Sequence, residues 1–280
     1  MKVNWIRFGD YPAPGRLAIF VALLLGVWVP IAVPIYWLVP DPNWVSILSM
    51  AVLYGEFILL VRFWGSRVYG QPQILKHYGL EFSRNNGQDL LGGLGFGLLS
   101  LLGLLVVEGL LGWLGWQLPN PAGLPKIMVE GLAIALGVGF AEELLFRGWL
   151  LEELKRDYLP TVAIAANATT FALLHFIKPL EAMIRNLPAF PGLLLLGLTL
   201  LAAKRLGQGR LGLPIGFHGG LVCGYYMINT GQLVQYSGAV PEWITGMDQN
   251  PIAGISGIFL LSAIAFGMNR TAEVKLKSEK

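Results

Sequence analysis

Long apolar stretches, separated by short polar segments, run through almost the whole chain. The stretches lie at about residues 17–39, 45–63, 90–115, 127–150, 158–176, 188–203, 211–229 and 252–268. A helix of roughly 20 apolar residues crosses the hydrocarbon core of a bilayer, which is about 30 Å thick. The pattern therefore predicts an all-α polytopic membrane protein with about eight transmembrane helices.

Composition supports this prediction. The chain is 55% hydrophobic and 13% charged, and a soluble domain usually carries nearly twice that charged fraction. The first apolar stretch is about 23 residues long, which is too long for the apolar part of a secretory signal, so we expect it to be retained. Cys223 is the only cysteine, so an intrachain disulfide is excluded.

The basic residues are distributed unequally between the two sides of the predicted bundle. If eight helices alternate, sixteen lysines and arginines lie on the side that holds both termini, and only Lys126, Lys178 and Arg185 lie opposite. Cytoplasmic segments of membrane proteins are enriched in basic residues, so we expect both termini in the cytoplasm. The net charge of +3 then reflects topology and the lipid bilayer as partner, and nucleic acid is not an expected partner.

The sequence also predicts specific roles for several segments between and within the helices. Residues 71–84 are too polar to span, so we expect them at the cytoplasmic interface, with His77 as an ordinary interfacial residue. Gly93 and Gly97 are four apart, which is typical of close helix packing. Residues 231–251 form a long outer loop that could cap a site.

Two adjacent glutamates and an arginine stand inside the apolar stretch "VGFAEELLFRGWLL". On a helix Glu143 and Arg147 share a face, and a glutamate four residues before an arginine is the favourable order for an ion pair. Glu142 points about 100° away. Glu143 can thus be neutralised by Arg147, while Glu142 is free to face a cavity as a general base. A buried clamp between two helices would also explain the same residues.

Other intramembrane acids are isolated. Glu56 and Glu108 have no titratable neighbour in their segments, which is typical of structural hydrogen bonding, and Glu130 is close enough to the outer interface to be solvated.

Two histidines add chemistry to the glutamate pair. His175 ends "TTFALLHF", four residues after Phe171, and His218 lies in "LGLPIGFHGG". Two histidines and a glutamate on three helices are typical of a site that activates water. Glu142, His175 and His218 could hold zinc with an open position. Without metal, Glu142 could deprotonate water while a histidine stabilises the oxyanion.

Together these motifs resemble the CPBP family of intramembrane proteases, which includes type II CAAX prenyl endopeptidases and bacteriocin-processing and immunity proteins. The family motifs EExxxR, FxxxH and HxxxN match Glu142, Glu143 and Arg147, then Phe171 and His175, then His218. The resemblance implies a catalytic core over 125–230, preceded by N-terminal helices and an interfacial segment (1–124) and followed by the outer loop, last helix and tail (231–280). It implies catalytic roles for both glutamates and both histidines, with Arg147 in support.

The chain departs from this family pattern at one position. The family asparagine, which helps orient water or the oxyanion, falls on Val222. Asn167, two turns before His175 on roughly the same face, could substitute for it. The depths of the two residues in the membrane also conflict with a shared site. Counting residues along the predicted spans places Glu142 near mid-membrane and His175 near the outer end of its helix, where they could not meet. Either that helix is displaced toward the cytoplasm and continues through "IKPLEAMIR", or the helix of Glu142 leaves the membrane earlier, near Trp149, or both apply.

The leading hypothesis is an intramembrane endopeptidase that hydrolyses a membrane-associated or lipidated protein or peptide. A non-catalytic scaffold or binding protein with the same fold is the alternative that Val222 favours. A proton-coupled transporter that uses Glu56, Glu108 and Glu142 as a relay is a third hypothesis.

Overall fold

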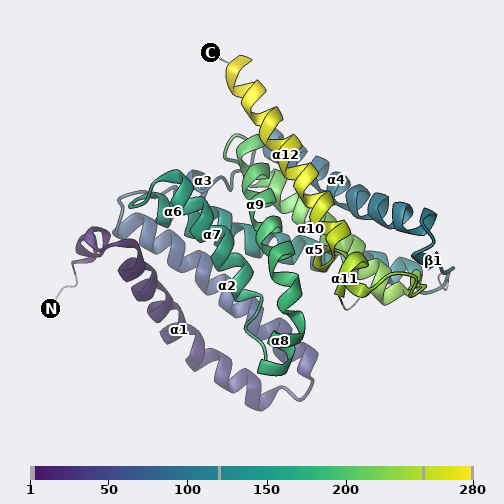
Figure 1. The fold of residues 1–280 in the computed structure, drawn as a ribbon. Coiled ribbons are helices and arrows are strands. Elements are labelled where there is room, and N and C mark those ends of the chain that lie inside the picture. The colour runs from purple at the N-terminus through teal and green to yellow at the C-terminus, as the bar shows by residue number, and fades with distance from the viewer. Residues whose placement is uncertain (1–3, 119–120, 248–249, 279–280) are drawn as a thin grey trace.

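The computed structural model describes residues 4–118, 121–247 and 250–278, which form a bundle of helices (Figure 1). The long helices are α1 (Ala13–Leu38), α2 (Pro42–Arg67), α4 (Arg84–Leu110), α5 (Leu124–Glu143), α7 (Pro160–Leu174), α9 (Phe190–Leu206), α10 (Gly212–Gly231) and α12 (Ile255–Ser278). The short helical elements are η1 (Trp5–Asp10), α3 (Ile74–His77), the π-helix η2 (Leu144–Leu150), α6 (Leu151–Lys155), α8 (Leu180–Asn186), η3 (Leu187–Ala189), α11 (Glu242–Thr245) and η5 (Pro251–Ala253). Strands β1 (Leu114–Trp116) and β2 (Val234–Tyr236) pair antiparallel.

Each predicted apolar stretch overlaps one of the long helices, but not every one of these helices is a candidate membrane span. Among the described residues, six segments are long and apolar enough to cross a membrane: Ala13–Leu38, Pro42–Arg67, Arg84–Leu110, Leu124–Lys155, Leu180–Leu206 and Ile255–Ser278. Helix α7 has 15 residues, and α10 is rich in glycine and largely buried. The structure therefore supports a helical multi-pass membrane protein, whereas the count of eight crossings and the sides of the termini stay predictions.

The predicted helix over 90–115 is wrong at its end. Helix α4 stops at Leu110, and Gly112 follows with a φ of +75°. This left-handed backbone suits glycine and ends the helix. Residues 114–116 then pair as β1 with β2, so the segment predicted as an outer loop contributes a strand to a two-stranded sheet.

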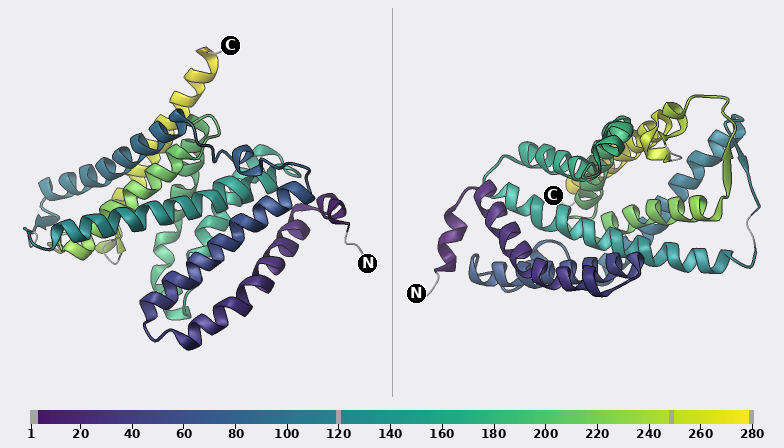
Figure 2. Two further views of the ribbon diagram at one scale, coloured as in Figure 1. Left: turned by 180° about the vertical axis from the view of Figure 1, so that it is seen from behind. Right: turned by 90° about the horizontal axis from the view of Figure 1, so that it is seen from below.

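Helix α10 lies at the centre of the bundle, between α4 and α5 (Figure 2). Glycines make this close packing possible. A methyl group at Gly97 would overlap the carbonyl oxygen of Phe217, and one at Gly220 would overlap that of Leu94. Small residues let membrane helices approach to backbone contact, which confirms the packing role predicted for Gly93 and Gly97. Because neighbours cover α10, it can carry a polar histidine.

Helices α5, η2 and α6 form one continuous rod, and α7 follows it. At 1.5 Å per residue, Glu142 and His175 lie at similar distances, about 20 Å, from the turn between α6 and α7. The expectation that His175 lies near the outer end of a full span is therefore wrong. The predicted continuation of this helix through "IKPLEAMIR" is also wrong, because α7 ends at Leu174 before a separate α8. The rod of α5, η2 and α6 continues past Trp149 to Lys155, and its exit from the membrane near Trp149 stays a prediction.

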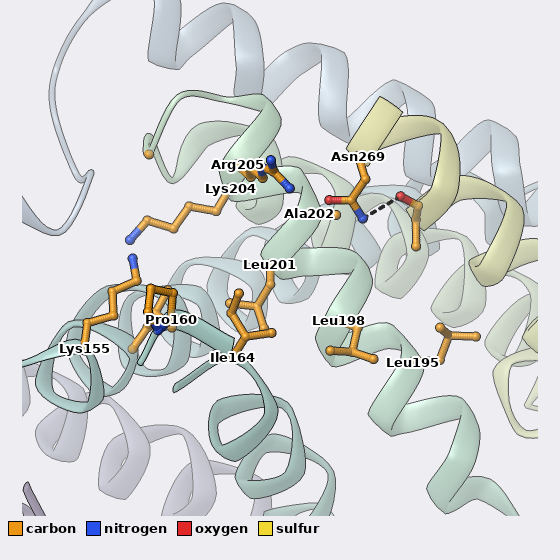
Figure 3. Close-up of a pocket in the computed structure, with 13 residues that line it drawn as sticks. Lys155, Pro160, Ile164, Leu195, Leu198, Leu201, Ala202, Lys204, Arg205 and Asn269 are labelled. Atoms are coloured by element: carbon orange, nitrogen blue, oxygen red, sulfur yellow. Dashed lines mark hydrogen bonds between the residues drawn. The ribbon is translucent and has the colours of Figure 1, made fainter. Parts of the chain in front are cut away.

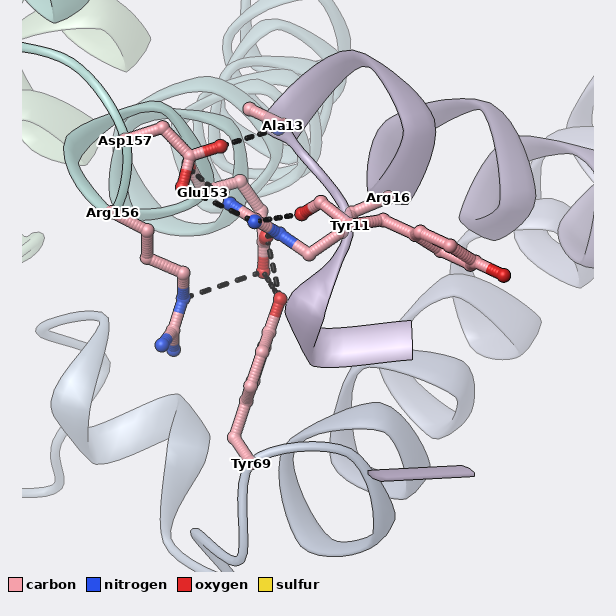
Figure 4. A network of polar contacts seen from close by, with 7 residues as sticks. All are labelled: Tyr11, Ala13, Arg16, Tyr69, Glu153, Arg156 and Asp157. Carbon is pink, nitrogen blue, oxygen red and sulfur yellow. Dashed lines mark hydrogen bonds and ion pairs between the residues drawn. The ribbon is translucent and has the colours of Figure 1, made fainter. Parts of the chain in front are cut away.

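A network of polar side chains ties α1 to the end of the rod (Figure 4). Arg16 is 3% exposed, and its Nε donates to Glu153 Oε2 at 3.0 Å. The hydroxyl of Tyr69 donates to the same oxygen at 2.6 Å. Burial, followed by the charge of Glu153, raises the pKa of Tyr69 and keeps its hydroxyl a donor. Glu153 is thus a buried residue with a structural role.

Candidate active site

The two glutamates and two histidines meet inside the bundle. Glu142 and Glu143 end α5, His175 follows α7 directly, and His218 lies in α10. Glu142 Oε2 is 3.8 Å from His175 Nε2 and 3.9 Å from His218 Nε2. Side chains from three helices therefore converge on one carboxylate.

Glu143 and Arg147 form the predicted ion pair. Arg147 Nη1 donates to Glu143 Oε1 at 3.0 Å, and both side chains are fully buried. Arg147 Nη2 donates to the carbonyl oxygen of Gly197 on α9 at 3.2 Å. The guanidinium also lies 4.3 Å from the ring centroid of Phe171. Such a charge is stable in the interior only when it is paired and hydrogen-bonded, and Arg147 has both kinds of partner.

Both histidine rings are held through Nδ1. His175 Nδ1 lies 2.7 Å from the carbonyl oxygen of Phe171, and His218 Nδ1 lies 2.9 Å from Glu143 Oε1. Since a carbonyl oxygen and an ionised carboxylate only accept, each Nδ1 carries a hydrogen and donates it. In the neutral ring Nε2 is then an acceptor, and each Nε2 faces Glu142.

Glu142 differs from Glu143 in exposure and in its partners, although each has an Oε2 atom without a hydrogen-bond partner among the described residues. Its side chain is 24% exposed, and its Oε2 has no hydrogen-bond partner among the described residues. Three acceptors, Oε2 and the two Nε2 atoms, thus lie close to one another. Such acceptors need donors, and a water molecule supplies two. The arrangement can bind a water and polarise it toward Glu142.

Comparison with known families matches the segment that holds this site. Residues 124–235 match the family described as type II CAAX prenyl endopeptidase Rce1-like. This segment is therefore similar to a Rce1-like domain. No curated protein and no solved structure matches the chain. The matched segment includes α5, η2, α6, α7, α9 and α10 and covers nearly the same residues as the predicted core, 125–230.

The Rce1-like site has the donor types of a zinc site but not its spacing. Two ligands of a tetrahedral zinc at about 2.0–2.1 Å stand about 3.4 Å apart. Both Glu142–His separations are wider, at 3.8 and 3.9 Å. No group of three His, Cys, Asp or Glu side chains in the described part of the chain could hold a metal ion. These positions suit a hydrogen-bonded water better than an ion, and zinc stays an untested prediction.

Neither Val222 nor Asn167 forms a side-chain hydrogen bond with Glu142 or either histidine in the described structure. Val222 is half-buried one turn beyond His218, and its side chain has no polar atom. Asn167 is fully buried, and its Nδ2 donates to the carbonyl oxygen of Phe146 at 2.7 Å. In the described structure it makes no hydrogen bond to Glu142 or to either histidine. The contacts of Asn167 support the backbone of η2 instead.

Sequence reasoning missed three contributors to the Rce1-like site. The π-helix η2 follows Glu143 directly and carries Arg147, and π-helical turns often occur at functional sites. Lys204 of α9 donates to the carbonyl oxygen of Arg147 at 2.7 Å. The hydroxyl of Tyr54, on α2, is close enough to Glu142 for an electrostatic interaction. These residues are far apart in sequence and have no motif spacing, so only the fold could reveal them.

The isolated acids lie outside the site. Glu108 is 1% exposed and accepts a hydrogen bond from Ser256 at 2.6 Å, which fits a structural role. Glu130 is partly exposed beside Lys126 and Tyr226. The oxygens of Glu56 have no hydrogen-bond partner among the described residues. In that part of the chain no contact joins Glu56 or Glu108 to Glu142, so the transporter hypothesis gains no support.

Proposed function

We propose that the chain is an intramembrane endopeptidase that hydrolyses a peptide bond in a membrane-associated or lipidated protein. The observation that supports this best is the convergence of the two Nε2 atoms on Glu142 Oε2, at 3.8 and 3.9 Å. The Rce1-like family is a protease family, and its description suggests a peptide that ends in a prenylated CAAX sequence. Glu142 and His175 are partly exposed, at 24% and 31%, as residues that receive water and substrate must be.

In the proposed reaction, Glu142 acts as general base on a bound water. The water oxygen attacks the scissile carbonyl carbon while Glu142 accepts the water proton. The carbon–nitrogen bond then breaks, and the same proton passes to the leaving amine. His175 and His218 orient the water through Nε2 when neutral. A protonated histidine donates through Nε2 to the oxyanion instead.

Glu143 and Arg147 position this machinery without touching the substrate. Glu143 fixes the ring of His218 through Nδ1, and Arg147 supplies the positive charge that pairs with Glu143. Phe171 holds His175 through its carbonyl oxygen. Each reactive group therefore has a partner that sets its orientation, as a preorganised site requires.

The test is cleavage by purified wild-type protein and Glu142→Gln in liposomes. Candidate substrates are a farnesylated peptide with a CAAX end, its unprenylated counterpart and co-expressed membrane proteins, and products are identified by mass. Glu142→Gln keeps size and polarity but removes the base, so activity should fall by about 10²–10⁴-fold with an unchanged melting temperature. Identical product profiles for both proteins across all candidates would contradict the proposal.

The non-catalytic scaffold is the second candidate, and Val222 is the observation that favours it. In that case the glutamates and histidines would be retained as a buried clamp. Binding of a membrane partner without any Glu142-dependent cleavage would support it.

A further inference from the structure

A groove on the outer face of α9 lies away from the glutamate and histidine site (Figure 3). It has a volume of about 540 Å³. Helix α9 forms its floor, because α9 packs against α7 on one side and α12 on the other. This volume lies within the range of about 300–1,000 Å³ for sites that bind small molecules.

The two ends of the groove differ in chemistry. Along α9 and α7 the lining is aliphatic, with Leu198 and Ile164 each 37% exposed. At the other end lie Lys155, Lys204 and Arg205, and Figure 3 shows Lys155 and Lys204 reaching toward each other. None of the described lining residues is acidic. The groove is thus apolar along its length and basic at its end.

The basic end carries surplus positive charge. Lys155 and Lys204 share a single carboxylate oxygen, Glu152 Oε1, at 3.1 Å each. Lys204 is buried there, whereas Lys155 is 39% exposed. Arg205 is exposed and forms no ion pair with any described residue. Three cations therefore line this end of the groove, and the carboxylate of Glu152 pairs with only two of them, Lys155 and Lys204.

The N-terminus of α7 adds to this positive field. Pro160, its first residue, lines the groove, and no side chain caps the first turn. Uncapped N–H groups at a helix start favour an anion, above all a phosphate. Two independent features, side-chain charge and helix polarity, therefore point to the same ligand chemistry at this end.

We propose that the groove binds an anionic glycerophospholipid, with its phosphate at Lys155, Arg205 and the start of α7 and an acyl chain along Leu198 and Ile164. A lipid is favoured over a soluble phosphate because α9 and α12 both belong to candidate membrane spans, so the apolar walls face hydrocarbon. The predicted topology places the basic end in the cytoplasmic leaflet, which is rich in anionic lipids. This proposal does not depend on the proposed protease activity.

The experiment is native mass spectrometry of the purified chain from nanodiscs that contain equal amounts of dioleoyl phosphatidylglycerol and dioleoyl phosphatidylcholine. Wild type should retain phosphatidylglycerol preferentially. The double variant Lys155→Gln/Arg205→Gln should lose most of this preference. Each basic residue near an anionic surface contributes roughly fivefold in affinity, so we expect a loss of about thirtyfold.

Two controls distinguish lipid binding in the groove from general attraction of anionic lipid to a basic surface. Lys76→Gln/Arg84→Gln removes two exposed basic residues of the predicted cytoplasmic side that do not line the groove, and it should keep the preference. Leu198→Trp fills the apolar part and should reduce retention of both lipids. Glycerol phosphate, which has the phosphate but no acyl chains, should not displace the bound lipid.

The proposal is overturned if the groove double variant keeps the wild-type preference or if both double variants lose it equally. Unchanged retention by Leu198→Trp would also overturn it. Displacement of the lipid by glycerol phosphate at similar concentration would assign the basic end to a soluble phosphate and exclude the lipid.

Discussion

At the scale of single residues, two neighbouring glutamates have opposite environments. Glu143 is fully buried, and its Oε1 accepts from both Arg147 and His218. Glu142 is partly exposed, and its Oε2 has no hydrogen-bond partner among the described residues. The carboxylate of Glu143 is therefore held by Arg147 and His218, whereas that of Glu142 can accept a proton.

Arg147→Ala should destabilise the protein strongly. Removal of one partner from a buried ion pair leaves the other charge uncompensated and costs about 3–5 kcal/mol. The melting temperature in detergent measures this loss. Arg147→Lys is the matched control, because it keeps the charge but cannot donate to Glu143 and Gly197 with the same fork, so a partial loss is expected. A melting temperature like that of wild type in Arg147→Ala would show that the pair contributes no net stability.

Val222→Asn should raise activity. Asparagine at this position, one turn beyond His218, would add a hydrogen-bond donor beside the proposed oxyanion, and one such donor contributes roughly 10²–10³-fold. Val222→Leu changes size without adding a polar atom and should leave the rate unchanged. Cleavage of the farnesylated peptide is the readout. Equal rates in all three proteins would show that this position does not face the reacting atoms.

At the scale of elements, the fold is governed by how closely helices approach. The sequence predicted the existence of all the long helices, because apolar length is a strong signal. It predicted the Glu143–Arg147 pair as well, because i,i+4 spacing is local. It could not predict the depth of His175, since that depends on where α7 ends. Nor could it predict that His218 binds Glu143 or that Glu153 is buried, since these contacts join distant segments.

The glycines of α4 allow a direct test of close packing. A methyl group at Gly97 would overlap the carbonyl oxygen of Phe217 in α10, whereas one at Gly103 meets nothing within 4 Å. Gly97→Ala should therefore destabilise by about 1–3 kcal/mol through overpacking. Gly103→Ala lies in the same helix and should be neutral or slightly stabilising. Thermal unfolding gives the melting temperatures of both variants, and equal values would contradict the packing of α4 against α10.

At the scale of the whole molecule, one end of the bundle gathers segments that sequence reasoning assigned to the same side of the membrane. Arg16 at the start of α1 contacts Glu153 at the end of α6, and Arg210 after α9 pairs with Asp89 in α4 at 2.7 Å. The backbone N–H of Leu211 donates to the carbonyl oxygen of Gly79. This shared end is what alternating helices require, and the basic surplus predicts that it lies in the cytoplasm.

Cysteine labelling tests this assignment of sides. Cys223 is the only cysteine and is buried, so a Cys223→Ala background removes the natural thiol at small cost. Asn4→Cys and Lys275→Cys report on the two termini, and Glu242→Cys reports on the segment between β2 and α12. A membrane-impermeant maleimide added to intact cells should label only Glu242→Cys, and the two terminal positions should react only after permeabilisation. We expect this result because sixteen basic residues lie on the predicted side of the termini and three on the other. Basic loops resist transfer across the membrane. Labelling of either terminus on intact cells would contradict the predicted topology of alternating helices with both termini in the cytoplasm. It would also move the basic end of the lipid groove to the outer leaflet.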